Sequence, residues 1–311
     1  MDNIQNRAIV VGIDGSANSD AALEWGVDEA VRRGLRLHLF CAGIRQVPGG
    51  DALDNDPHLA ADVMRAALAA ADNRLAAAAA HARQRSADLA ITFESAVDHA
   101  AGGLVDLSAQ ADAVVLGRSG HGPMVGALLG SVALQVVTHA RCPVVAVQAS
   151  TGDGSSNARG VVVGVDGSGG SVLALGYAFE QASWRGVPLE VVHAWWTTAT
   201  YGLTQEFQRQ QADQERLTLS ETLVGWSEKY PDVEVRTSLP MGPAELTLTE
   251  AAKDAELLVV GSRGRGGFRS LLLGSVSQGV LQHATCTVAV VREQSRISDM
   301  VAGRPSVEDT Q

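Results

Sequence analysis

The chain has 311 residues, a formal net charge of -11, and 46% hydrophobic residues with few aromatics. This length predicts about two domains, each large enough to bury a core. The acidic balance argues against a large nucleic-acid footprint, so we expect no nucleic-acid partner. No apolar run is long enough to span a membrane, and the polar start has no signal-peptide pattern. We therefore expect a cytoplasmic protein without membrane contact.

Three cysteines, Cys41, Cys142 and Cys286, lie in or beside apolar runs. Three thiols cannot all pair within one chain, and no Cys-x-x-Cys pattern is present. We expect buried, reduced thiols, as is usual in a reducing compartment.

The sequence repeats itself over nearly its whole length. The segment Val10–Ser16 reappears as Val162–Ser168, and Leu128–Val132 reappears as Leu272–Val276. Between the copies lies a polar stretch rich in Gly and Ser, which is typical of a flexible linker. The sequence thus predicts a first domain at 1–148, a linker at 149–159, a second domain at 160–293 and a flexible tail at 294–311.

Short β-branched runs alternate with longer helical patterns in both copies. In the first copy we predict strands at 8–13, 35–41, 89–95, 113–116 and 144–147. In the second copy we predict strands at 161–165, 189–193, 233–239, 257–260 and 287–291. Helical patterns cover 20–33, 58–85 and 207–230. The central runs are continuously apolar, as in parallel strands covered on both faces, so each copy is predicted to be a doubly wound α/β domain.

A glycine-rich pattern, G-x-x-G-x9-G-S, follows the fourth predicted strand of each copy. Glycines let the backbone approach an anion, and the final Gly-Ser precedes a helix whose N-terminus favours phosphate. The basic side chains could add charge or be solvated, and the whole pattern could be a duplicated turn that binds nothing. The candidate phosphate-binding residues are Gly117, Arg118, Ser119, Gly120, His121, Gly122, Gly130, Ser131 and Val132 in the first copy, and Gly261, Ser262, Arg263, Gly264, Arg265, Gly266, Gly274, Ser275 and Val276 in the second.

Further candidate residues lie where the first two strands of each copy end. Asp14 and Asp166 could hydrogen-bond a ribose hydroxyl or hold Mg²⁺ through water. Alternatively each aspartate caps the following helix, and both roles can coexist. The remaining candidates are Gly12 and Gly164 on the first strand, and Ala42 and Ala194, whose backbone could meet an adenine edge.

The doubled glycine motif and the strand-ending aspartates resemble the universal stress protein family, in its tandem ATP-binding class found in actinobacteria. The resemblance covers 7–148 and 160–292. It implies two Rossmann-like α/β domains, each a five-stranded parallel sheet of order 3-2-1-4-5 with helices on both faces. It also implies ATP in each domain, with the ribose at Asp14 and Asp166 and the adenine beside Ala42 and Ala194. We expect Mg²⁺ to accompany the ATP. Because the family commonly pairs through its last strand, we expect a homodimer, and an unidentified protein partner is also considered.

Two functions from different classes fit these features. The first is an ATP-binding regulatory protein of the stress response, with one nucleotide site per domain. The alternative is a slow ATPase or nucleotidyl-transfer enzyme on the same fold. No Walker loop and no repeated Ser/His/Asp set is present, and the repeated His139 and His283 lie late in a helix, where the dipole stabilises them. We therefore expect no catalytic residues and weak ATP hydrolysis at most.

Overall fold

The computed structural model describes residues 7–43, 57–120, 129–149, 160–196, 205–265 and 272–292. The predicted linker beyond residue 149 and the predicted tail lie outside these ranges. The chain clusters into two compact units, Met1–Ser156 with Leu281–Val288, and Asn157–Val280 with Ala289–Gln311.

The first repeat contains five parallel strands. They are β1 (Ala8–Gly12), β2 (Arg36–Gly43), β3 (Ile91–Val97), β4 (Ala113–Gly117) and β5 (Val144–Val147). Their order is β3-β2-β1-β4-β5, which confirms the predicted doubly wound topology. Strands β4 and β5 are buried almost throughout, because helices cover both faces of a sheet built this way.

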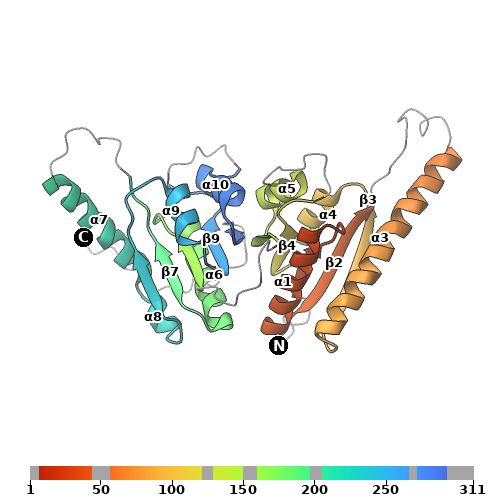
Figure 1. Ribbon diagram of the computed structural model, residues 1–311, viewed down its shortest axis with the longest axis horizontal. Coiled ribbons are helices and arrows are strands. Elements are labelled where there is room, and N and C mark those ends of the chain that lie inside the picture. Colours follow the sequence, from red (N-terminus) through yellow and green to blue (C-terminus); the bar gives the residue numbers. More distant parts are fainter. Residues whose placement is uncertain are drawn as a thin grey trace, which may run out of the picture. The chain divides into compact units, whose positions relative to one another are not determined.

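Helices cover the first sheet in two pairs (Figure 1). On one face α1 (Ala17–Arg33) packs on β1 and β4 and touches α3 (Pro57–Arg85), which packs on β2 and β3. On the other face α4 (Ala100–Leu107) touches α5 (Ser131–His139). Successive residues of β1 face opposite sides of the sheet, which explains why helices cover both faces. Val11 packs against Gly26 of α1, whereas Gly12 faces Leu104 of α4.

The second repeat has the same order of elements. Its strands are β6 (Val161–Gly164), β7 (Leu189–Val192), β8 (Val235–Ser238), β9 (Leu257–Gly261) and β10 (Thr287–Val291), in the order β8-β7-β6-β9-β10. Its helices are α6 (Gly169–Arg185), α7 (Gln205–Leu223), α8 (Trp226–Lys229), α9 (Ala244–Ala251) and α10 (Ser275–His283).

The first helix of each repeat begins and ends in the same way. Ser16 caps α1 by accepting a hydrogen bond from the Ser19 main-chain N–H, and Ser168 caps α6 correspondingly. Gly34 ends α1 with φ 63° and Gly186 ends α6 with φ 65°, a left-handed conformation that glycine adopts without strain. The first strand and its helix are therefore joined by a short, fixed turn.

The single helix predicted at 207–230 is divided in two. Gly225 adopts φ 78°, which separates α7 from the short α8. Trp226 and Tyr230 then stack beside Phe179 of α6, with ring centroids 5.4 Å from the Phe179 ring in both cases. Burial in this cluster raises the pKa of Tyr230 to about 12. A helical sequence pattern alone does not reveal this break, which the aromatic packing stabilises.

None of the helices described here combines the length and the apolar character that crossing a membrane requires.

Candidate functional site

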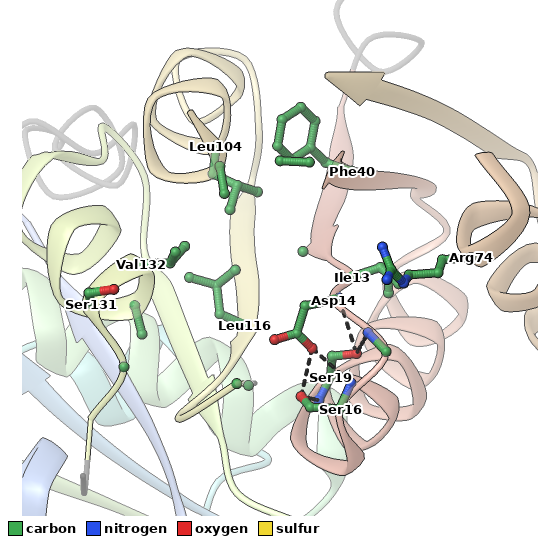
Figure 2. Close-up of a pocket in the computed structure, with 18 of the residues that line it drawn as sticks. Ile13, Asp14, Ser16, Ser19, Phe40, Arg74, Leu104, Leu116, Ser131 and Val132 are labelled. Carbon is green, nitrogen blue, oxygen red and sulfur yellow. Dashed lines mark hydrogen bonds between the residues drawn. The ribbon is translucent and has the colours of Figure 1, made fainter. Parts of the chain in front are cut away.

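A cavity of about 800 Å³ opens at the carboxyl ends of β1, β2 and β4 in the first repeat. Figure 2 shows Ser131 and Val132 on one wall, Asp14 near the centre and Arg74 on the opposite wall. In an open parallel sheet this edge is where ligands bind. Most predicted residues of the first copy line the cavity, namely Gly12, Asp14, Ala42, Gly117, Ser119, Gly120, Gly130, Ser131 and Val132.

The strand-ending aspartates form turns and are not helix caps. The Asp14 carboxylate accepts hydrogen bonds from the Ser16 main-chain N–H at 2.9 Å and the Ser16 hydroxyl at 2.6 Å. Asp166 makes the same two bonds with Ser168, at 3.0 and 2.6 Å. Since Ser16 and Ser168 are themselves the caps, the alternative in which the aspartates cap the helices is wrong.

In the second repeat the aspartate is bonded to a further segment of the chain. Asp166 also accepts a hydrogen bond at 2.8 Å from the main-chain N–H of Arg265. Burial by itself would raise the pKa of Asp166, but the hydrogen bonds from Ser168 and Arg265 outweigh it and hold this pKa below its usual range. The carboxylate is therefore anionic at neutral pH.

We use the name glycine loop for residues 117–120 with Gly130–Ser131, and for residues 261–264 with Gly274–Ser275. In both repeats the same main-chain hydrogen bond closes the loop, from Gly130 N–H to the Arg118 carbonyl and from Gly274 N–H to the Ser262 carbonyl, each 2.8 Å long. This agreement confirms that the repeated motif forms one structure twice.

The glycines of the loop serve different purposes. A Cβ atom at Gly120 would collide with the Asp14 carboxylate, and one at Gly264 would collide with Asp166. A Cβ at Gly117 would lie 2.8 Å from Asn18 of α1, so this glycine permits packing between the loop and the helix and not only an approach to phosphate. Three of these glycines are thus explained by contacts within the protein.

Gly130 is different. Its φ of -72° suits any residue, and a Cβ built there meets no atom of the described residues closer than 3.5 Å. Neither the backbone conformation nor the described neighbours of Gly130 therefore require glycine at this position. Gly130 lines the cavity and precedes α5, whose first N–H groups have no partner within the helix by its geometry. A bound anion at this helix N-terminus would account for the glycine.

Arg118 does not line the cavity, although it was a candidate phosphate-binding residue. Its side chain is 3% exposed, and its guanidinium donates to the main-chain carbonyls of Ala284 and Cys286, in the segment that clusters with the first unit. The positive charge of Arg118 thus has main-chain partners away from the cavity lining.

Sequence reasoning missed three residues of the first site. Asn18 in the first turn of α1 donates to the Ser119 carbonyl at 3.0 Å and hydroxyl at 2.8 Å, and accepts from the Ala149 N–H at 2.8 Å. Phe40 provides an apolar wall, and Arg74 enters from α3. No motif marks these residues, and Gly170 occupies the place of Asn18 in the second copy.

The predicted residues of the second copy surround the corresponding strand ends. Arg265 places its guanidinium over Gly167, directly after Asp166. Ser262 is buried, and its carbonyl accepts hydrogen bonds from Gly274 N–H and the Ser277 hydroxyl. Ala194 follows the end of β7, and the other described candidates are Gly164, Gly261, Arg263, Ser275 and Val276. His121, Gly122 and Gly266 lie outside the described residues.

A metal would depend on the ligand for most of its coordination. Within the described parts of the chain, no group of three or more His, Cys, Asp or Glu side chains is placed to hold an ion. The residues fit Mg²⁺ only as a companion of phosphate oxygens and water, with the Asp14 carboxylate as the acidic side chain beside them.

These features define a class of protein: a tandem of Rossmann-like domains, each with a glycine loop at the sheet edge where ligands bind. The chain belongs to the universal stress protein family, whose model matches residues 5–148 and 157–292.

Known relatives match across both repeats. A universal stress protein of Mycolicibacterium smegmatis is 35% identical over 287 residues, covering 91% of this chain and 96% of the relative. One from Mycobacterium tuberculosis is 36% identical over 294 residues, covering 93% and 98%. A solved universal stress protein from Archaeoglobus fulgidus shares the fold, with a TM-score of 0.58, 19% identity, and coverage of 93% of this chain and 98% of that one.

Proposed function

We propose that the protein is an ATP-binding regulator of the stress response, with one nucleotide site in each repeat. Membership of the universal stress protein family supports the stress-response role. The cavity supports ATP as the ligand. A helix N-terminus faces it from one wall and could bind phosphate, and apolar side chains such as Phe40 and Leu104 could pack against the base. A cavity of about 800 Å³ is of the size that such ligands occupy.

Gly130 is the observation on which the proposal chiefly rests. The described residues leave room for a side chain there, yet the residue is glycine beside the first turn of α5. In the proposed complex the polyphosphate occupies this space and accepts hydrogen bonds from the Ser131 and Val132 N–H groups. Asp14 would bind the ribose, and Mg²⁺ would neutralise phosphate charge that the protein leaves unpaired.

The first experiment is to denature the purified protein and identify any released nucleotide, then to titrate the emptied protein with ATP by calorimetry. We expect two ATP per chain. An absence of both released nucleotide and measurable ATP binding would overturn the proposal.

A matched pair of variants locates the first site. Gly130→Ala should remove one ATP per chain without loss of stability, since its methyl group meets only ordinary contacts within the protein. Gly102→Ala, on α4 with its nearest neighbour at 3.9 Å, is the control and should keep both sites. Two undiminished ATP sites in Gly130→Ala would show that the loop is misassigned.

The homodimer, the cytoplasmic location and a protein partner stay predictions. Light scattering of the purified protein with and without ATP would test the dimer directly. The three buried thiols, which form no disulfide, support a reducing compartment.

A further inference from the structure

Arg74 is placed as a ligand-binding residue would be, although it lies on a helix far from the glycine loop in sequence. It lines the cavity of the first repeat, and of the described residues in that lining it alone carries a basic side chain. Its neighbours on the same helix face are small and apolar: Val63, Ala66, Ala67 and Ala70. The wall that α3 gives to the cavity is therefore apolar apart from one guanidinium.

The guanidinium lies beside the turn that carries Asp14. The Arg74 Cδ and Nε atoms are 3.6 Å from the position of a Cβ at Gly15. Figure 2 shows the side chain reaching from α3 toward Ile13 and Asp14. It also lies beside the Cys41 thiol at the end of β2. A ligand that meets Asp14 thus comes within reach of the Arg74 donors.

The second repeat places a guanidinium at the corresponding turn by a different route. There Arg265, on the glycine loop itself, lies over Gly167, the counterpart of Gly15. Two unrelated positions in the sequence thus bring an arginine to the same place in the two repeats. A shared requirement of the ligand explains this coincidence better than the fold does, because the hydrogen bonds within each turn come from serine and main-chain groups and not from the arginine side chain.

In the second repeat, α7 is joined to the end of β7 by a contact between two side chains. His193, which is buried at the end of β7, bonds through Nδ1 to the Val165 carbonyl at 2.8 Å. Its Nε2 atom lies 2.8 Å from the Glu215 carboxylate on α7. In the first repeat, Cys41 in the last part of β2 takes the place of His193, and α3 presents Arg74 to the cavity.

We infer that Arg74 is a nucleotide-contacting residue of the first site, the counterpart of Arg265 in the second, and that it couples bound nucleotide to α3. This inference rests on the proposed function. The guanidinium donates to oxygen atoms of the ribose and of the phosphate attached to it, which are the ligand atoms nearest Asp14. Binding at the first site therefore stabilises α3 on the sheet, whereas α7 is already held by the His193–Glu215 pair.

The first test measures ATP binding to the full chain. Arg74→Gln should weaken one of the two sites by about tenfold or more, the usual effect of losing a charge-assisted hydrogen bond, and leave the other unchanged. Arg265→Gln should weaken the other site, and the double variant should weaken both. Arg74→Lys should recover part of the affinity because it keeps the charge.

Arg65→Gln is the matched control. Arg65 lies on the same helix, where it is exposed and pairs with Asp62, so both sites should keep their affinity. Equal thermal stability of the Arg65 and Arg74 variants without ATP would exclude a folding defect.

Hydrogen exchange tests the coupling. ATP should slow amide exchange in residues 63–75 of α3 in the unaltered protein, and Arg74→Gln should abolish this protection even when its weakened site is saturated. Exchange in α7 should change little in either protein. Two ATP sites of unaltered affinity in Arg74→Gln would overturn the inference and leave the proposed function intact, whereas no ATP binding by the unaltered protein would overturn both.

Discussion

Asn18 shows how a single side chain can position the glycine loop. Its amide joins the first turn of α1 to Ser119 of the loop and to Ala149 after β5. Three segments that are far apart in sequence thus meet at one residue. The loop should keep its shape only while all three hydrogen bonds are made.

Replacement of Asn18 by alanine should therefore affect the first site alone. We expect Asn18→Ala to lower the free energy of unfolding by about 1–3 kcal/mol, because it leaves polar groups of the loop without their partner. ATP affinity at the first site should fall, with the second site unchanged, as measured by calorimetry on the full chain. Asn73→Ala, at an exposed position of α3, is the control, and an equal effect of both changes would contradict the assignment.

The sequence identified those parts of the site that both copies share. Glycine spacing and the strand-ending aspartates are repeated, so they could be found by comparing the halves. Asn18 and Arg74 could not, because the second copy has Gly170 in place of Asn18 and brings Arg265 from another element. A side chain that reaches the cavity from a helix face leaves no local pattern.

At the level of elements, two glycines of α1 separate the effect of backbone conformation on stability from the effect of side-chain packing. Gly34 has φ 63°, and a Cβ there meets no atom of the described residues within 4 Å. Gly26, in the middle of the same helix, is instead packed so tightly that a Cβ would lie 2.5 Å from Val11 on β1. Gly34 is therefore required by its backbone conformation, and Gly26 by the close packing of α1 on β1.

Alanine at Gly34 should destabilise the protein by about 1–2 kcal/mol through left-handed strain alone. Gly34→Asn should cost less, because asparagine tolerates this conformation better. Gly26→Ala should cost about 1–3 kcal/mol by overpacking. Urea unfolding curves measure all three, and a Gly34→Asn variant no more stable than Gly34→Ala would exclude conformational strain as the cause.

The buried central strands were predicted closely, whereas the division of the helix predicted at 207–230 was not predicted. The apolar run at 144–147 coincides with β5, and the run at 287–291 with β10, since buried parallel strands leave a continuous apolar signature. By contrast, the break at Gly225 depends on stacking between Phe179 and Trp226, which lie on different helices. Contacts of that kind are not visible in a local pattern.

At the level of the whole molecule, the three cysteines report on the integrity of the fold. Cys41, Cys142 and Cys286 are buried, as predicted, and none of them forms a disulfide. Burial also raises the pKa of the Cys41 thiol, although the neighbouring Arg74 guanidinium opposes this shift. The reactive thiolate is therefore both inaccessible and disfavoured.

A thiol reagent at pH 8 should accordingly label no cysteine of the native protein within minutes and all three after denaturation. The rate of labelling in increasing urea should follow unfolding measured by circular dichroism. Rapid modification of any one thiol in the native protein would show that its region opens independently of the rest.

The difference between Asn18 and Gly170 also limits how the two halves can evolve. In the first repeat the loop is anchored by an amide, whereas in the second the backbone itself approaches, since a Cβ at Gly170 would lie 2.9 Å from the Arg263 carbonyl. Neither residue can replace the other. Genetic recombination that copied one half onto the other across this point would damage a site, so selection should keep the duplicated segments divergent there.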